Sequence, residues 1–175
     1  MNESKAKLML AVRDQVVFIK INGRGDFNLS LDLRKLIDEL RRRSYCRFVF
    51  ELSECVMMDS TFLGILSGEG LKSCSDNPAG GPSLELLNPI PRIVETLENL
   101  GVAHLFKITH CPDSLSVNYE SLAQTEDKTK TEVTRNCLDA HKTLMDVNPA
   151  NVHRFKDVAE FLAQDLKRLE STAKK

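Results

Sequence analysis

The sequence is poor in the features that mark several common protein classes. It has 175 residues with no tryptophan and two tyrosines, and no uninterrupted apolar run of about 18 residues, so no transmembrane helix is expected. The first residues, Met1 to Lys5, lack the apolar core of a signal peptide, which favours the cytoplasm. Lysine and arginine number 24 against 25 aspartates and glutamates, and the net charge of -1 gives no general attraction to nucleic acid or anionic membranes.

Signals for metal sites and disulfides are also missing. The sequence has five cysteines, an odd number with no C-x-x-C pair, which is untypical of a disulfide framework or a zinc site. We expect them to be small buried thiols. The four histidines are scattered, without zinc-like spacing. His141 and His153 fall on neighbouring predicted helices, where a pair on the surface is expected. The sequence therefore predicts no metal and no cofactor.

Signatures of catalysis are absent as well. There is no G-x-S-x-G nucleophile motif and no G-x-x-x-x-G-K-[ST] phosphate-binding loop. Gly23-Arg24-Gly25 lacks the third glycine of a dinucleotide-binding loop and does not open a helix directly. Arg41-Arg42-Arg43 ends a predicted helix, where cations stabilise the negative end of the helix dipole, so these arginines indicate no nucleic acid. We predict that the protein is not an enzyme.

What the sequence does contain is an alternation of strand and helix patterns. Runs of β-branched and aromatic residues predict strands, and apolar residues at every third or fourth position predict helices. The predicted strands are residues 6–12, 16–21, 47–52, 83–87 and 105–108, and the predicted helices are residues 30–44, 60–75 and 89–101. This order predicts an α/β fold with a mixed, partly parallel sheet and crossover helices packed mainly on one face.

The C-terminal part follows another pattern. Residues 110–128 are polar with little periodicity, which predicts a linker or a loosely packed crossing segment. Thr129 and Glu132 have the spacing of a capping box, which predicts the start of a helix over residues 131–146. A turn separates it from a second helix over residues 150–171, so the two helices form a hairpin.

The chain therefore divides into three predicted parts: a domain over residues 1–109, a linker over residues 110–128 and a helical hairpin over residues 129–175. The second helix of the hairpin carries a strong apolar stripe, which must be buried. Three ways of burying it are open. The hairpin can dock on its own domain, pair with a second copy to form a homodimer, or bind a different partner.

One turn is the candidate site. Asp59 and Ser60 lie between a predicted buried strand and a helix, and both residue types are common N-caps, so the turn alone indicates no more than a helix start. On the following helix, Phe62 and Ile65 fall outside the face that suits the core. A phenylalanine and an isoleucine beside a cap serine predict an exposed apolar spot, which suits the docking of another protein.

The same segment resembles a known family. Met58-Asp59-Ser60-Thr61-Phe62-Leu63-Gly64 is similar to the D-S-[ST]-G-L-G signature of STAS domains, the anti-sigma factor antagonist family. Upstream, Ile21-Asn22-Gly23-Arg24-Gly25-Asp26 resembles the family's turn after the second strand. Downstream, Leu86-Leu87-Asn88-Pro89 and the segment from Gly101 to Ile108 resemble later parts of the domain. The resemblance covers about residues 7–109 and does not reach the hairpin.

Two positions depart from the family pattern. Phe62 stands where the family has a glycine, and Arg24 stands where it has a glutamate. Both fall on the expected binding face. A phenylalanine in place of the glycine also resembles the scaffold-type members found in large stress-signalling complexes.

The resemblance implies a bacterial regulator of transcription. In the family, the serine after the aspartate is phosphorylated by an anti-sigma factor that is also a serine kinase, and a serine phosphatase removes the phosphate. That residue is Ser60 here, with Thr61 as the alternative. The implied function is an anti-sigma factor antagonist that sequesters the kinase and is switched off by phosphorylation. The implied partner-binding residues are Arg24, Asp26, Asp59, Ser60, Thr61, Phe62 and Ile65. The alternative is a scaffold or subunit, without phosphorylation, of a stress-signalling or transporter-associated complex.

Overall fold

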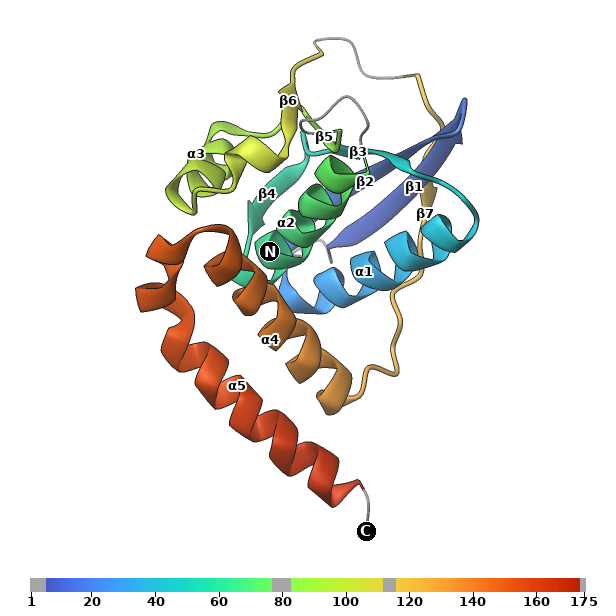
Figure 1. The fold of residues 1–175 in the computed structure, drawn as a ribbon. Coiled ribbons are helices and arrows are strands. Elements are labelled where there is room, and N and C mark those ends of the chain that lie inside the picture. Colours follow the sequence, from blue (N-terminus) through green and yellow to red (C-terminus); the bar gives the residue numbers. More distant parts are fainter. Residues whose placement is uncertain (1–5, 77–82, 112–115, 174–175) are drawn as a thin grey trace, which may run out of the picture.

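The first two strands form a hairpin on one side of the sheet (Figure 1). The computed structural model describes residues 6–76, 83–111 and 116–173. β1 (Lys7–Arg13) and β2 (Val16–Gly25) pair antiparallel through Asp14 and Gln15, which both have positive φ. Left-handed backbone at both positions of a two-residue loop matches the right-handed twist of the strands. The predicted hairpin is confirmed.

The strands form one mixed sheet in the order β6-β5-β3-β2-β1-β7. The further strands are β3 (Arg47–Glu51), β4 (Cys55–Met58), β5 (Glu85–Leu87), β6 (Lys107–Thr109) and β7 (Glu120–Ser121). Parallel pairing joins β2 to β3, β3 to β5 and β5 to β6, whereas β1 pairs antiparallel with β2 and with β7. The predicted mixed, partly parallel sheet is confirmed.

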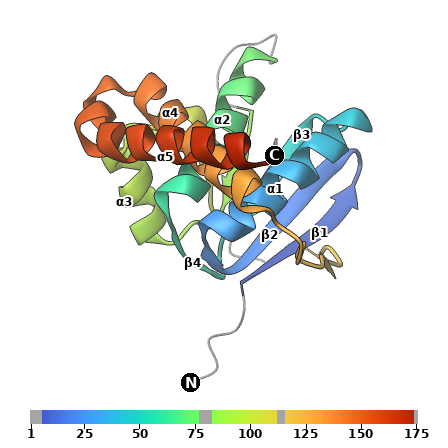
Figure 2. The same cartoon turned by 90° about the horizontal axis from the view of Figure 1, so that it is seen from below.

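Three helices connect the parallel strands: α1 (Phe27–Arg42), α2 (Ser60–Ser75) and α3 (Pro91–Asn99). Figures 1 and 2 show the helices gathered mainly on one face of the sheet. Along β2, Val17, Ile19 and Ile21 are buried, and the residues between them are half-buried. This alternation is typical of a sheet with one face in the core. None of the helices in the described ranges is long and apolar enough to cross a membrane.

The strand β4 lies between the predicted strand over residues 47–52 and the predicted helix over residues 60–75, where no strand was predicted. It pairs parallel with the end of β2, which continues past β3 to Gly25 instead of ending at residue 21. Gly23 has a positive φ, and the register shifts between Gly23 and Arg24. Gly23, which follows the predicted end of the strand, therefore lies at a bulge within a longer strand.

Residues 116–128 carry the chain along the sheet edge toward the hairpin. β7 pairs with β1, and the backbone N–H of Leu122 donates to the carbonyl of Leu8 at 2.9 Å. The Lys128 ammonium then binds the carboxylate of Asp32 on α1 at 2.6 Å. The described part of the predicted linker is thus tied to the domain at both ends.

The hairpin consists of α4 (Lys130–Val147), a 3-10 turn η2 (Pro149–Asn151) and α5 (Val152–Thr172). The predicted capping box is present: Thr129 and Glu132 hydrogen-bond reciprocally at the start of α4. Figures 1 and 2 show α4 lying between α2 and α5, so that the hairpin forms an added layer over α2. Two buried bonds hold its turn, because Asn151 Nδ2 donates to the carbonyls of Leu100 and Leu144 at 2.9 and 3.0 Å.

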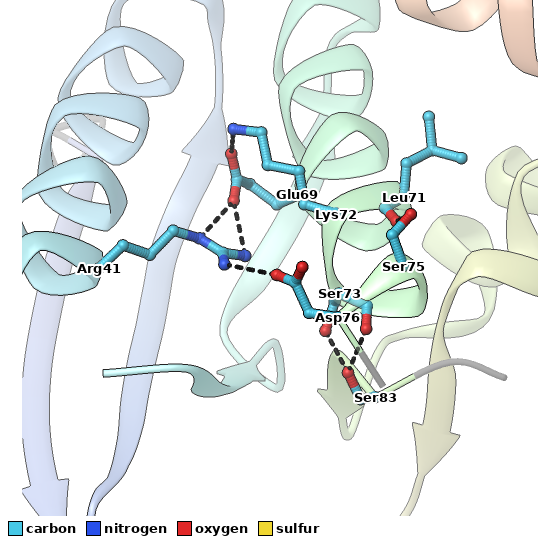
Figure 3. Close-up of polar contacts among 8 residues, drawn as sticks. All are labelled: Arg41, Glu69, Leu71, Lys72, Ser73, Ser75, Asp76 and Ser83. Atoms are coloured by element: carbon cyan, nitrogen blue, oxygen red, sulfur yellow. Dashed lines mark hydrogen bonds and ion pairs between the residues drawn. The ribbon is translucent and has the colours of Figure 1, made fainter. Parts of the chain in front are cut away.

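An ion-pair network fixes the far half of α2 against α1 (Figure 3). The carboxylate of Glu69 is 4% exposed and accepts from Arg41 on α1 at 3.2 Å and from Lys72 at 2.7 Å. Arg41 also contacts Asp76 at the end of α2 at 3.4 Å. A buried carboxylate needs such partners, because an unpaired charge in the interior is strongly unfavourable. The network anchors α2 independently of the hairpin.

Candidate functional site

The candidate site is the turn that joins β4 to α2. Because β2 and β4 run parallel, their carboxyl ends meet at one edge of the sheet, and the segments that follow them start α1 and α2 side by side. Asp26 caps α1 by accepting from the backbone N–H of Leu29 at 2.9 Å. Asp59 caps α2 by accepting from the backbone N–H of Phe62 at 2.8 Å. Both capping residues are therefore part of one surface region.

Asp59 joins the two helix starts. Its second carboxylate oxygen accepts from the backbone N–H of Phe27, the first residue of α1, at 2.8 Å. Burial raises the pKa of Asp59, and the bonds from the N–H groups of Phe62 and Phe27 oppose that rise. The charge of nearby Asp26 raises the same pKa further. Asp59 therefore sets the geometry of the turn that presents Ser60.

The hydroxyl of Ser60 is engaged by the hairpin. Ser60 Oγ lies 2.9 Å from Nε2 of His141 on α4. The other ring nitrogen, Nδ1, lies 2.7 Å from the carbonyl oxygen of Cys137, which can only accept. In the neutral ring Nδ1 thus carries the hydrogen, and Nε2 accepts a hydrogen bond from the hydroxyl of Ser60. The ring also packs against Phe155 of α5, with centroids 5.1 Å apart.

Thr61 also faces α4, at Cys137, one turn before His141. Its side chain lies beside the thiol of Cys137, whose pKa is raised by burial and by the charge of Asp59, while Thr61 opposes that rise. Thr61 itself is buried, whereas Ser60 is half-buried. Both hydroxyl residues of the motif therefore point toward α4.

A close approach of two helix backbones completes this contact. A Cβ added at Gly64 of α2 would lie 2.4 Å from the carbonyl oxygen of Ala140 on α4, a distance that no real Cβ tolerates. A Cβ added at Gly68, one turn further, would lie 3.8 Å from Thr143 and fits without strain. Glycine at position 64 is thus what allows α4 to lie directly on the start of α2.

The expectation that Phe62 and Ile65 form an exposed apolar spot is wrong. Phe62 is 0% exposed and Ile65 is 7% exposed. Phe62 points into the core, where a Cβ at Gly25 would come within 3.0 Å of its ring, so the glycine in β2 makes room for the phenylalanine that departs from the family pattern. Ile65 is buried on a helix whose residues 61–67 are all buried. Arg24 remains exposed beside the site.

His141 is a site residue that the sequence did not identify. The expectation of a surface pair with His153 is wrong, since His141 is 6% exposed and bonds to Ser60, while His153 is exposed. The local pattern gave no sign of this bond, because Phe62, Leu63, Ile65 and Leu66 all fall on one side of the helix and Ser60 and Gly64 fall on the other.

A hollow of about 230 Å³ adjoins the turn between β4, α2 and α3. Four of its six lining residues are apolar, and Arg92 and Thr96 of α3 are the polar ones. Ser60 and His141 do not line it. The chemistry of the site is therefore that of a capped helix start with a hydroxyl held by a neighbouring helix.

Comparison with known proteins agrees with this geometry at the level of the fold. No protein-family model and no curated protein matches the chain. Among solved structures, it is similar to the anti-sigma factor antagonist SpoIIAA in its unphosphorylated form, with 17% identity, a TM-score of 0.50, and 58% of this chain and 87% of that chain covered. It is also similar to a Thermotoga maritima protein assigned as an anti-sigma factor antagonist, with 21% identity, a TM-score of 0.51, and 61% and 86% covered. The chain therefore has the STAS fold, as its motifs predicted.

Proposed function

We propose that this chain, which has the fold of anti-sigma factor antagonists, binds an anti-sigma factor that is also a serine kinase through the turn at the start of α2. Phosphorylation of Ser60 ends that binding, and a serine phosphatase restores it. One observation carries the proposal. Ser60 is the first residue of a helix capped by Asp59, and its hydroxyl points away from the core toward a second helix.

Such a position suits a phosphorylation switch for electrostatic reasons. A phosphate adds about -1.5 to -2 charges at neutral pH. At a helix start the N–H groups and the helix dipole stabilise that charge, so the domain keeps its fold. The same charge beside Asp59 repels an acidic partner surface and is poorly solvated in an interface. The switch therefore acts on binding and leaves the domain folded.

A scaffold role without phosphorylation is the second candidate. It is favoured by the engagement of Ser60 with His141, because a hydroxyl that only holds two helices together needs no kinase. It is also favoured by Phe62, whose ring lies in the core instead of leaving the space of a glycine at the surface. In this role the protein joins a stress-signalling or transporter-associated complex.

The test is affinity capture with the full chain as bait in a lysate of the organism that encodes it. The baits are wild type, Ser60→Ala, Ser60→Asp and a control, Ser171→Asp, which adds the same charge at an exposed serine of α5. Captured proteins and the phosphorylation state of Ser60 and Thr61 are identified by mass spectrometry.

The switch predicts that Ser60→Ala and Ser171→Asp capture an anti-sigma factor with kinase activity, and that Ser60→Asp captures at least about tenfold less, a difference of about 1.4 kcal/mol. Equal capture by Ser60→Ala and Ser60→Asp contradicts the switch. Capture of scaffold or transporter subunits, with no phosphate on Ser60 or Thr61, favours the second role.

A further inference from the structure

The hairpin occupies the surface that the proposed function assigns to the partner. α4 covers Ser60 through His141, Thr61 through Cys137 and Gly64 through Ala140. A kinase cannot approach the Ser60 hydroxyl along its O–H direction while the imidazole fills that space at 2.9 Å. Partner docking and hairpin docking therefore exclude one another at the same residues.

The contact between α4 and α1 is largely polar. Asn136 donates to the Ser30 hydroxyl at 2.9 Å, and Arg34 binds both Asn136 and Asp139, at 3.2 and 2.9 Å. Lys35 pairs with Glu132 at 2.9 Å. Polar contacts of this kind are typical of interfaces between units that separate, because exposed polar groups are well solvated by water.

The outer helix of the hairpin is weakly held. Among the 21 residues of α5, Ala159 and Asp165 are the buried ones. Phe161 is 65% exposed and Val158 is 40% exposed. An element with few buried apolar contacts opens at a low free energy relative to the core. The apolar residues that α4 buries are Leu138, Ala140 and Leu144.

We propose that the α4–α5 hairpin is a built-in competitor of the partner: the chain exchanges between a closed form, in which α4 covers Ser60, and an open form that binds the partner. The inference rests on the proposed function, which makes the start of α2 the docking surface. The occupant is the hairpin of the same chain, since the ordered path over residues 116–128 delivers α4 to α2 within one molecule.

Closure weakens partner binding by a calculable factor. The apparent dissociation constant equals the intrinsic one divided by the fraction of open molecules. If the open form is populated at about 0.1–10%, a variant that is always open binds the partner about 10-fold to 1,000-fold more tightly than wild type. A variant that is always closed does not bind.

Two full-chain variants shift the equilibrium in opposite directions. Ala140→Glu places a bulky charge on α4 where the backbone of Gly64 leaves no room, and it leaves the docking surface of α2 unchanged. Its control is Ala150→Glu, the same substitution at an exposed residue of η2. Gly68→Cys with Thr143→Cys allows a disulfide between α2 and α4, since a Cβ at position 68 lies 3.8 Å from Thr143 Cγ2. The reduced form of that variant is the control for its oxidised form.

Hydrogen exchange followed by mass spectrometry measures opening without any partner. We expect Ala140→Glu to increase exchange at least about tenfold over residues 60–66 and 130–147, while peptides of β2 and β3 stay protected. The oxidised disulfide variant is expected to exchange more slowly there than its reduced form. If the β2 and β3 peptides exchange together with the hairpin, the hairpin is a fixed part of the fold and the inference is overturned.

Partner capture supplies the second readout, with the anti-sigma factor as the probe if one has been identified as above. We expect Ala140→Glu to capture more of the anti-sigma factor than wild type and Ala150→Glu do. The oxidised disulfide variant should capture none, and its reduction should restore capture. Equal capture by the open and the oxidised forms would overturn the competition but leave the proposed function standing. Failure to capture any anti-sigma factor would remove the proposed function, and the exchange data would still show whether the hairpin opens. A disulfide that joins two chains on a non-reducing gel would refute the intramolecular form.

Discussion

Replacement of Gly64 by alanine tests the closest contact between the domain and the hairpin. In the interior of a helix, alanine is more favourable than glycine by about 1 kcal/mol. At Gly68 the new methyl group finds ordinary contact with Thr143, so Gly68→Ala is expected to stabilise the protein by about that amount. At Gly64 the methyl group would lie 2.4 Å from the Ala140 carbonyl oxygen, so α2 and α4 have to separate.

The expected difference between the two variants follows from this contact. Overpacking of a tight interior costs about 1–3 kcal/mol. Because both variants gain the same helix propensity, Gly64→Ala should unfold with a free energy about 1–3 kcal/mol below that of Gly68→Ala. The loss also has an upper limit. If the hairpin opens, the molecule avoids the clash by undocking α4, so the cost cannot exceed the free energy of hairpin docking.

Urea unfolding followed by circular dichroism measures the difference, with the wild type beside both variants. Unchanged m-values would show that the same surface is exposed on unfolding, and a lower m-value for Gly64→Ala alone would show that the hairpin is already undocked. Equal stability of Gly64→Ala and Gly68→Ala, with equal m-values, would refute the close packing of α4 on the start of α2.

Two further predictions concern the ends of α4. Asn151→Ala removes two buried hydrogen bonds and leaves the carbonyls of Leu100 and Leu144 with Asn148 as their donor. At about 0.5–1.5 kcal/mol for each bond, it should lower the free energy of unfolding by about 1–3 kcal/mol in the same urea assay, whereas Asn118→Ala at an exposed site should change it by less than about 0.5 kcal/mol. Equal effects would contradict the buried bonds. At the other end, hydrogen bonds from Lys35 and from Thr129 lower the pKa of Glu132 from 4.5 to about 2. A carboxylate whose pKa is lowered in the folded state stabilises that state above pH 4.5, and this stabilisation is lost as the pH falls toward 2. Relative to the intrinsic rate, hydrogen exchange at the start of α4 should therefore rise as the pH falls over this range in wild type and change less in Glu132→Gln.

The sequence predicted the parts of the fold that depend on local patterns. The β1–β2 hairpin, the helix capped by Asp59 and the capping box of Thr129 and Glu132 are all confirmed, because each depends on residues close together in the chain. The motif around Ser60 predicted the fold for a similar reason, since several short segments matched in order.

The sequence failed where distant segments meet. The bond between Ser60 and His141 joins two residues that are 81 positions apart in the sequence. Amphipathic periodicity on one helix shows which face meets the sheet, but it does not show that a later helix covers the other face. The extension of β2 to Gly25 was missed because Gly23 and Gly25 resemble a strand end, whereas a bulge at Gly23 and a close approach of Gly25 to Phe62 require them.

The apolar start of α2 explains why one surface serves both the hairpin and a partner. Leu63 and Leu66 belong to the hydrophobic core, while the side chain of Thr61 and the backbone at Gly64 lie against α4. When α4 leaves, these groups become exposed to water, at a cost of about 25 cal/mol for each Å² of apolar surface. The open form is therefore unfavourable on its own and becomes stable only when another protein covers the same residues. Because α4 contacts Ser60 and the backbone at Gly64, access to this surface depends on competition between the hairpin and the partner.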